Sequence, residues 1–227
     1  EYNILFNSSD QSEVNDLTSI YGRLNNRVEE NLDLTRTQTP KALNQELKVY
    51  YTLNEDHIFS FEAQHLDQTE DPIGRAVRDR NPFLSLIPFD SNVQRFDITQ
   101  NRFIETQKLE AKLDYFYLLN DQSNINLSIG FTNVAQNYLS DFNQTLDDGT
   151  TKSFDDEQFN NNVDFSFKDL YFALNYRIRT GIFTIDPGLT LHFYDNKNTQ
   201  LGQTFAKDIS DISCLLYTSP SPRDGRI

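Results

Sequence analysis

Several residue types that usually identify a protein class are rare or missing from this chain of 227 residues. Met and Trp are absent, and a single Cys excludes any disulfide within the chain. Only 37% of the residues are hydrophobic, and no apolar run approaches the roughly 18 residues that a membrane-spanning helix needs. The lack of Met and of a basic-then-apolar leader is typical of a mature secreted protein or an internal fragment.

Positive charge is also scarce. The sequence holds 20 Lys and Arg against 34 Asp and Glu, which gives a formal net charge of −14. Binding to nucleic acid requires a basic groove or stripe, so the charge balance argues against a nucleic-acid partner. It indicates an acidic, well-solvated surface and identifies no other partner.

Patterns that carry catalysis or metal binding are missing as well. There is no Ser/His/Asp set, nucleophile elbow or phosphate-cradling loop among only eight glycines, so we expect no catalytic residues and no enzyme. His57, His65 and His192 lie in separate segments without the close spacing of a metal site. The acidic stretch 146–158 lacks EF-hand spacing, so we expect a solvated loop, no metal and no cofactor.

The sequence is rich in aromatic and turn-forming residues, with 18 Phe and 11 Tyr. Phe and Tyr favour strands, and Asn and Asp favour turns, so the composition indicates an all-β chain. Apolar residues occupy alternate positions in three pairs of segments, which predicts three β-hairpins. The segments are 46–53 with 57–66, 108–119 with 124–133, and 170–178 with 183–193.

Two segments fit this pattern less simply. Val163, Phe165 and Phe167 are odd-numbered, but the apolar series continues at even-numbered Leu170. Either a β-bulge near Lys168 and Asp169 restores the facing, or the strand changes its apolar face there. In the first long connection, apolar residues spaced three or four apart predict a helix, whereas the strand-like run "SIYGRL" argues against it. The spaced residues are Val14, Leu17, Tyr21, Leu24, Val28 and Leu32.

The connections alternate between short turns and long segments, at roughly 8–42, 68–104, 139–162 and from 196 onward. Structureless loops of that length are uncommon in compact soluble domains, whereas outer-membrane barrels combine short periplasmic turns with long external loops. Tyr residues near strand ends also suit the aromatic girdle of such a barrel. They are Tyr50, Tyr51, Tyr117, Tyr176 and Tyr194. Alternation alone fits a soluble β-sandwich equally well, because both structures hide one face of each strand.

The strand–turn–strand segments also resemble a known family. "NQELKVYYTLNEDHIFSFEAQHL", "NRFIETQKLEAKLDYFYLLNDQSNINLSIGFTN" and "FNNNVDFSFKDLYFALNYRIRTGIFTIDPGLTLHFY" look like the barrel of TonB-dependent receptors. The closest likeness is to the type with carboxypeptidase-regulatory-like and plug domains upstream, and it spans about residues 1–205. The resemblance implies a partial antiparallel up-and-down transmembrane β-barrel of about seven or eight strands, one arc of a 22-stranded barrel in the cell outer membrane.

The same resemblance implies partners for the complete protein. They are outer-membrane lipid and lipopolysaccharide, an external ligand, and the TonB complex through a plug domain that is absent from this chain. Two alternatives remain open. One is an outer-membrane barrel without TonB coupling, acting as an adhesin or passive pore, and the other is a soluble secreted β-sandwich binding module.

One loop, residues 71–91, stands out as a candidate ligand-binding site. Arg75, Arg78 and Arg80 precede the apolar run "FLSLIPF" between Pro82 and Pro88. The arginines could pair with lipopolysaccharide phosphates or with an entering ligand, since guanidinium groups bind such anions in bidentate fashion. The alternative, which we favour, is that Phe83, Leu84, Leu86 and Ile87 simply pack the loops together.

The end of the chain has a different origin. Residues 214–224, "CLLYTSPSPRD", resemble the translation of a transposase adapter used in preparing DNA for sequencing. We therefore expect residues 1–213 to be the partial barrel domain and residues 214–227 to be a non-native, adapter-derived tail. On this interpretation Cys214 is not biological and the gene was read only in part.

Overall fold

The computed structural model describes residues 1–21, 28–81, 87–154 and 161–220. They form one antiparallel 12-stranded sheet. Eight strands follow one another across it in the order β1-β4-β5-β7-β8-β10-β11-β12, and we call them the wall. The wall strands are β1 (Tyr2–Ser8), β4 (Lys41–Thr52), β5 (His57–Glu70), β7 (Phe96–Asn120), β8 (Ser123–Thr145), β10 (Asn161–Thr180), β11 (Phe183–Gln200) and β12 (Gln203–Pro220).

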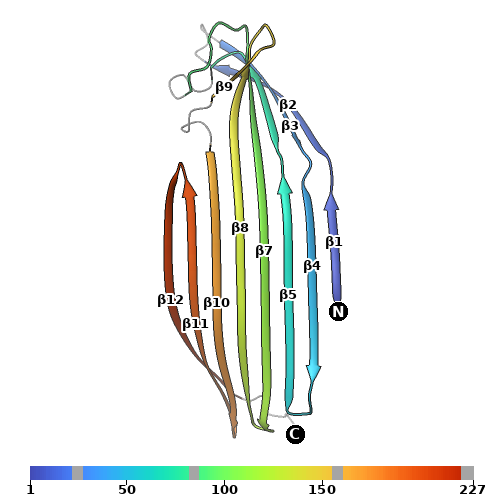
Figure 1. The fold of residues 1–227 in the computed structure, drawn as a ribbon, viewed down its shortest axis with the longest axis vertical. Helices are drawn as coiled ribbons and strands as arrows, with labels where there is room; N and C mark the ends of the chain where they lie inside the picture. The colour runs from blue at the N-terminus through green and yellow to red at the C-terminus, as the bar shows by residue number, and fades with distance from the viewer. Residues whose placement is uncertain (22–27, 82–86, 155–160, 221–227) are drawn as a thin grey trace.

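The three predicted hairpins are confirmed, and the predicted fold class and strand number agree with the wall. Tight turns join β4 to β5, β7 to β8 and β10 to β11 at the lower end of the sheet (Figure 1). Asn54 Oδ1 accepts the backbone N–H groups of Asp56 and His57, an Asx-type arrangement that closes the first turn. Gly181 adopts a φ of 59° in the third, which a residue with a side chain rarely does.

Four further strands lie at the upper end of the sheet, off the wall path (Figure 1). They are β2 (Gln11–Tyr21), β3 (Val28–Gln38), β6 (Ile73–Arg78) and β9 (Thr151–Ser153). β2 pairs with β3, β3 with β6, and β6 with the start of β7, while β9 pairs with the end of β8. We call this upper region, with the connection 87–95, the cap (Figure 1). The long segments predicted as loops therefore contain much strand: β2, β3 and β6 pair with one another, and β7 and β8 extend upward to pair with β6 and β9.

The helix prediction in the first long connection is wrong. β2 and β3 form an antiparallel hairpin in which Leu17 lies opposite Leu32 and Tyr21 lies opposite Val28. The spacing of three or four residues is produced by two strands meeting across a turn, so that the apolar residues face partners on the neighbouring strand. Leu24, which belonged to the predicted helical face, lies outside the described residues.

The parity break in β10 is a change of face without a bulge. Pairing of β10 with β8 runs without a shift from Asn161–Ser140 to Ile178–Ser123, and its pairing with β11 is in register on both sides of Lys168. Leu170, Phe172 and Leu174 therefore share one face, and Val163, Phe165 and Phe167 lie on the other. The first of the two readings of this segment, a bulge at Lys168 and Asp169, is wrong.

The last strand runs into the segment that resembles an adapter. β12 pairs with β11 from Gln203 opposite Gln200 to Pro220 opposite Phe183. Backbone pairing depends little on side-chain identity, so the ladder shows only that the segment is extended. The adapter origin of residues 214–227 stays a prediction.

Among the described residues, the cluster of buried apolar side chains lies in the cap. Phe89, Phe96, Ile98 and Phe154 are buried against one another, with Ile87, Val93 and Phe142 beside them. Below the cap the wall is a single layer of sheet, and no second layer of protein covers either face among the described residues. In those residues no helix has the length and apolar character needed to cross a membrane.

The two edges of the wall predict how the isolated chain behaves. β1 pairs only with β4 and β12 only with β11, so each edge presents unpaired backbone N–H and C=O groups. Such edges are tolerated neither by lipid nor by water, and they promote association. We expect the 227-residue chain, expressed alone in detergent, to form oligomers or aggregates in size-exclusion chromatography. A cooperative monomeric barrel in that experiment would contradict this prediction.

Candidate functional site

The most extensive candidate surface is an apolar belt on one face of the wall. Three successive rows of cross-strand neighbours from β4 to β12 consist almost wholly of apolar residues, because the register is continuous from strand to strand. The rows are Tyr51-Phe59-Tyr115-Leu127-Leu174-Leu189-Cys214, Val49-Phe61-Leu113-Ile129-Phe172-Leu191-Ile212 and Leu47-Ala63-Ala111-Phe131-Leu170-Phe193-Ser210. We call this surface the belt and the side of the sheet that carries it the belt face.

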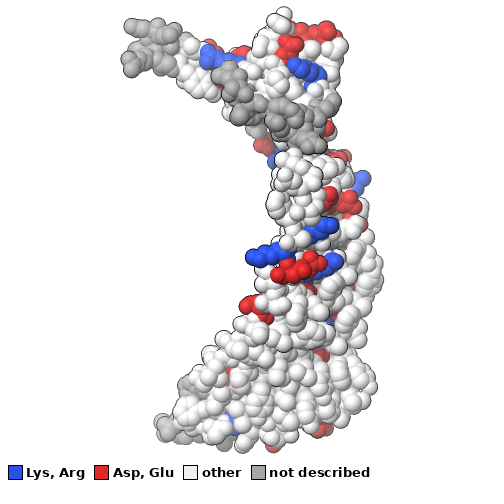
Figure 2. All heavy atoms as spheres, turned by 60° about the vertical axis from the view of Figure 1, so that its left-hand side comes forward, with Lys and Arg blue, Asp and Glu red and all other residues white. Residues whose placement is uncertain are grey.

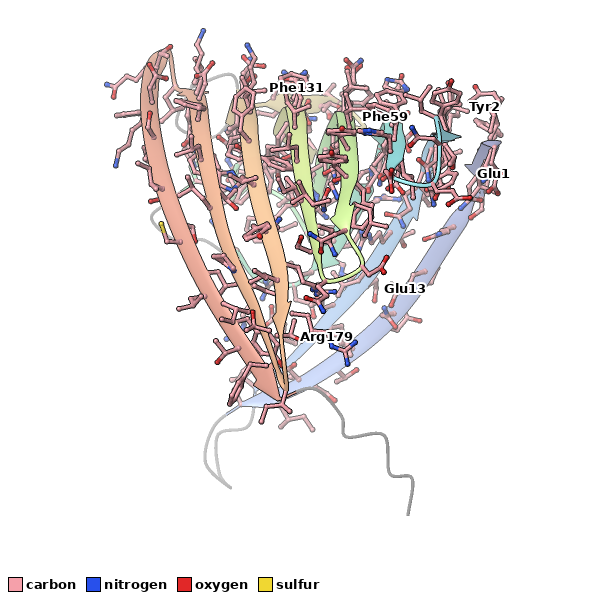
Figure 3. All side chains as sticks on the ribbon, turned by 90° about the horizontal axis from the view of Figure 1, so that it is seen from below. Glu1, Tyr2, Glu13, Phe59, Phe131 and Arg179 are labelled. Carbon is pink, nitrogen blue, oxygen red and sulfur yellow. The ribbon has the colours of Figure 1, made fainter. Side chains whose placement is uncertain are left out.

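Many of the large belt side chains are exposed although they lie in the middle of the sheet, and the others are half-buried. Ile129 is 39% exposed and Phe172 is 41% exposed. Phe59 and Phe131 point to the same side of the sheet (Figure 3). Charged side chains are nearly absent from the lower part of the surface seen in Figure 2, and they gather at mid-height and above. An apolar surface of this extent on a single sheet indicates that something other than this chain covers it.

The opposite face of the wall is polar, and we call it the polar face. The row between the first two belt rows contains Ser60, Asp114, Ser128 and Thr190. Neighbouring groups satisfy one another: the Ser128 hydroxyl donates to Asp114 at 2.5 Å, and His192 Nδ1 lies 3.0 Å from Asp169 Oδ2. The face of the wall opposite the belt is therefore polar, and its side chains hydrogen-bond to one another.

Aromatic residues line the lower border of the belt. His57 stacks on Tyr117 with ring centroids 4.5 Å apart, and its Nδ1 lies 2.7 Å from the Tyr115 hydroxyl. Tyr51, Tyr117 and Tyr176 of the predicted girdle share the belt face. Tyr50 and Tyr194 lie on the polar face, so the girdle prediction is wrong for these two residues. Tyr115, which the sequence prediction did not include, completes the cluster.

The three candidate arginines occupy different positions in the cap. Arg75 forms a bidentate pair with Asp97, and Arg78 pairs with Glu30, which is 4% exposed. Arg80 is exposed and has no ion pair among the described residues. Arg75 therefore joins β6 to β7, and Arg78 joins β6 to β3. Of the apolar run that follows, Ile87 packs on the buried cluster, and Phe83, Leu84 and Leu86 lie outside the described residues.

Arg95, which the sequence prediction did not include, links three parts of the cap. Its Nε donates to Asp79 at 3.0 Å, its Nη1 to Asp33 at 2.8 Å, and its Nη2 to the Val77 carbonyl at 3.1 Å. The partners lie up to 62 residues away in the sequence, so no local motif could have indicated them.

The connection 87–95 is fastened to the sheet by a buried amide. Gln144 is completely buried, its Oε1 accepts the Asp90 backbone N–H at 2.7 Å, and its Nε2 donates to the Asp90 carbonyl at 2.8 Å. Replacing the side chain would remove the hydrogen-bond partner of both part-buried backbone groups, at a cost of up to about 1–3 kcal/mol each. This contact holds Phe89 against Phe154, with ring centroids 5.0 Å apart.

A pocket of about 380 Å³ opens on the cap beside this cluster. Its floor is apolar, with Leu32, Leu34 and Ile98, and Arg36 and Arg78 are among the charged groups at its rim. By alternation along β7, Ile98 lies on the same side of the sheet as the polar face of the wall. Two of the three predicted ligand-binding residues, Arg75 and Arg78, are therefore among the residues that line this pocket.

Charged contacts shift the pKa values of several cap residues. The backbone N–H of Asn31 and the Arg95 guanidinium hold the pKa of Asp79 below its usual range. The hydrogen bond to Asp97 raises the pKa of Arg75. In the predicted acidic loop, the Thr150 hydroxyl and N–H lower the pKa of Asp148. In the described ranges no three His, Cys, Asp or Glu residues gather as a metal site.

Comparison with known proteins gives similar folds. No family model and no curated protein matches the sequence. The ferric citrate transporter FecA is 12% identical, with a TM-score of 0.37 over 98% of this chain and 42% of its own. The ferric preacinetobactin receptor BauA of Acinetobacter baumannii is 8% identical, with a TM-score of 0.36 over 98% of this chain and 45% of its own. The ferripyoverdine receptor of the outer membrane of Pseudomonas aeruginosa is 10% identical, with a TM-score of 0.39 over 98% of this chain and 40% of its own.

The chain thus spans less than half the length of each of these three structures. Because the identities are at most 12% and the TM-scores at most 0.39, we base the functional conclusion on the residues of the sheet itself.

The contacts of Asp79 predict that the cap becomes less stable in acid. Because the pKa of Asp79 is lower in the folded protein than its ordinary value of 3.8, its contacts stabilise the cap above that value and are lost as the pH falls through the folded pKa. We expect the hydrogen-exchange protection of the Asn31 N–H in the complete protein to be constant above about pH 5 and to fall below about pH 4.

Two variants control this experiment. Asp79→Asn should reduce the protection at neutral pH and flatten its acid dependence. Asp148→Asn should leave both unchanged, because the Asp148 contacts are with its own turn. Unaltered acid dependence in Asp79→Asn would contradict the assignment.

Proposed function

We propose that this chain forms part of the wall and of the ligand-facing loops of an outer-membrane TonB-dependent receptor. The observation that carries the proposal is the belt, three apolar rows on one face of the wall that no second layer of the described residues covers. In water such a surface would be unfavourable by about 25 cal/mol for each Å² exposed, whereas hydrocarbon removes that penalty. The ladders satisfy backbone N–H and C=O groups within the wall, as a bilayer requires.

The dimensions of the belt fit a bilayer. On β10 the apolar side chains of this face extend from Leu170 to Ile178. At a rise of about 3.4 Å per residue this is about 27 Å along the strand, and a tilt of about 40° reduces it to about 20 Å along the membrane normal. Outer-membrane barrels have an apolar band of about 25 Å. A sandwich would need a second sheet against the belt, and the described residues form only one.

The two ends of the wall support an orientation. Tight turns close the lower end, and the cap with its pocket and ion pairs occupies the other. Outer-membrane barrels keep their short turns in the periplasm and their long segments outside. The cap would therefore face the exterior, where Arg78 and the neighbouring pocket meet an incoming ligand at the mouth of the barrel. The plug domain and the coupling to TonB are part of this proposal because of the resemblance in sequence alone.

Arginine substitutions on adjacent positions test the membrane assignment. Leu174→Arg places a charge in the middle of the belt, and we expect it to destabilise the complete barrel by about 2–4 kcal/mol. Thr190→Arg, on the polar face of the neighbouring strand, should cost less than 1 kcal/mol. Urea titration of the barrel folded into lipid vesicles measures both. Equal effects of the two substitutions would refute a lipid-facing belt.

The uninterrupted gene tests the transport assignment separately. We expect its upstream part to encode a plug domain and a TonB-box segment, and ligand uptake to stop when TonB is deleted from the cell. A signal peptide followed directly by strands would instead support the adhesin or passive-pore alternative. This result is independent of the arginine substitutions, because both kinds of barrel face lipid.

A further inference from the structure

The pocket of about 380 Å³ in the cap, which we call the cap pocket, has a floor that the chain leaves open. Gly74 on β6 lies opposite Arg36 of β3 and Gln100 of β7. A Cβ atom added to Gly74 would meet nothing within 4 Å. The next residue of β6 on this face, Ala76, is also small, and both line the pocket. The open space therefore lies directly above the strand.

The fold itself does not explain this glycine. Gly74 has no positive φ, so its backbone suits residues that carry a side chain. The other two glycines inside the described strands, Gly130 and Gly188, are covered by the Tyr171 ring and the Asn175 amide. Glycine weakens a strand, and it often marks a site where a ligand or another group approaches closely. Because no group of the described chain approaches Gly74, the space above it is available to a ligand.

The walls of the cap pocket decide what can enter it. The apolar side chains around the opening are Leu32, Leu34, Ile98 and Phe142. Arg75 also lines the pocket, and Asp97 balances its charge. Arg78 is balanced in the same way by Glu30. The part of a ligand that lies above Gly74 is therefore apolar.

Two charged residues at the rim are not balanced by each other. Glu13 on β2 lies directly opposite Arg36 on β3, and both are exposed. Opposite charges in this position usually pair across the strands, but no ion pair joins these two described residues. Asn15 instead donates to the Glu13 carboxylate at 2.8 Å, and Arg36 donates to Gln38 at 3.0 Å. Each bond uses only part of the capacity of its charged group, so a carboxylate and a guanidinium remain for a ligand.

We propose that the cap pocket binds a free α-amino acid with a large apolar side chain. The side chain lies above Gly74, the amino-acid carboxylate pairs with Arg36, and the ammonium group pairs with Glu13. Neighbouring strands are about 4.8 Å apart, which suits two charges carried by one carbon atom, whereas each added residue of a peptide moves its charged ends about 3.4 Å further apart. This inference rests on the proposed function, in which the cap meets external ligands, and it adds the class of ligand.

Calorimetric titration of the complete, folded receptor tests the proposal with four probes. They are phenylalanine, N-acetylphenylalanine without the ammonium group, phenylalanine amide without the carboxylate, and glutamine, which has both charges and a polar side chain. We expect phenylalanine to bind at least tenfold more tightly than each of the other three, as expected for loss of one charge-assisted hydrogen bond or of the apolar contact.

Variants assign each charge to its partner. Arg36→Gln should weaken phenylalanine binding about tenfold and leave the binding of phenylalanine amide unchanged, because the amide has no carboxylate to lose. Glu13→Gln should likewise weaken phenylalanine binding and leave N-acetylphenylalanine unaffected. Gly74→Val fills the floor, so it should weaken phenylalanine binding at least tenfold without lowering the thermal unfolding midpoint, since valine favours strands.

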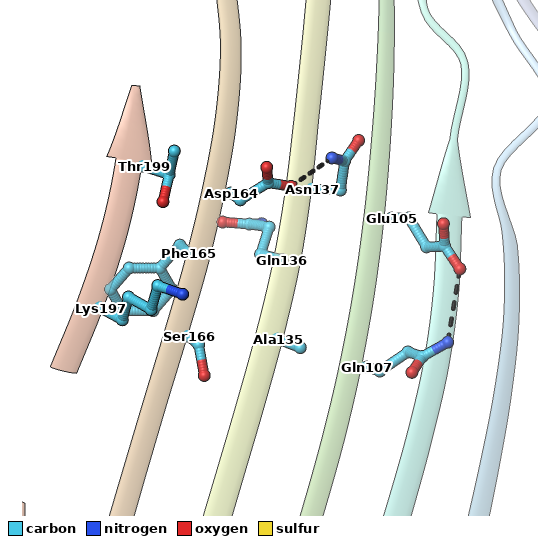
Figure 4. A pocket seen from close by; sticks show the side chains of 10 residues that line it. All are labelled: Glu105, Gln107, Ala135, Gln136, Asn137, Asp164, Phe165, Ser166, Lys197 and Thr199. Atoms are coloured by element: carbon cyan, nitrogen blue, oxygen red, sulfur yellow. Dashed lines mark hydrogen bonds between the residues drawn. The ribbon is translucent and has the colours of Figure 1, made fainter. Parts of the chain in front are cut away.

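A hollow on the other side of the sheet supplies the matched control. Figure 4 shows Ala135 among the polar side chains that line a groove of about 500 Å³. By alternation along β8, Ala135 shares the belt face with Phe131 and lies on the face opposite the cap pocket. Ala135→Val also adds a branched side chain to a strand beside a cavity, and it should leave phenylalanine binding unchanged.

Absence of phenylalanine binding, or equal binding of phenylalanine and its two derivatives, would overturn the proposal. Undiminished binding by Gly74→Val would do the same. If Leu174→Arg still destabilises the barrel as predicted, such a result refutes the amino-acid site and leaves the membrane-facing wall intact. Phenylalanine binding together with equal effects of Leu174→Arg and Thr190→Arg would instead support the site and refute the wall.

Discussion

Continuous register is the constraint on which the rest of this structure depends. From β4 to β12 each strand pairs with the next without a shift across the belt, so a residue's parity decides which side of the sheet it occupies. Because the same parity rule acts in seven neighbouring strands, scattered apolar residues become one belt and the intervening residues become one polar face. The proposed function depends on this separation, since a wall between lipid and water needs two unlike faces.

Much of the wall was predictable from sequence because its determinants are local. Alternation of residues such as Leu109, Ala111 and Leu113 identifies a strand, and the Asn54–Asp56 turn identifies a hairpin. The same local logic failed for Val14, Leu17 and Leu32, whose spacing fits one face of a helix and also fits two paired strands. In the structure β3 also pairs with β6, a partner about 40 residues away in the sequence that local spacing does not reveal.

The cap was less predictable because its contacts are long-range. The loop 71–91 attracted attention through its arginines, and the structure shows Arg75 and Arg78 engaged by Asp97 and Glu30. Arg95 and Gln144 have unremarkable sequence surroundings, yet they fasten the connection 87–95 to three strands. A single sequence contains no signal for such partners, because the fold that brings them together must exist first.

The change of face in β10 has a consequence for how such a wall can vary. Val163, Phe165 and Phe167 point to one side and Leu170 to the other, although the backbone ladder passes between them undisturbed. On β10 the belt therefore ends where apolar side chains stop occupying the belt face, although the backbone hydrogen bonds of the strand continue past that point. In the proposed membrane wall, point substitutions alone can raise or lower that limit and match it to bilayers of different thickness. Insertion of one residue would instead move every later side chain on that strand to the opposite face of the sheet.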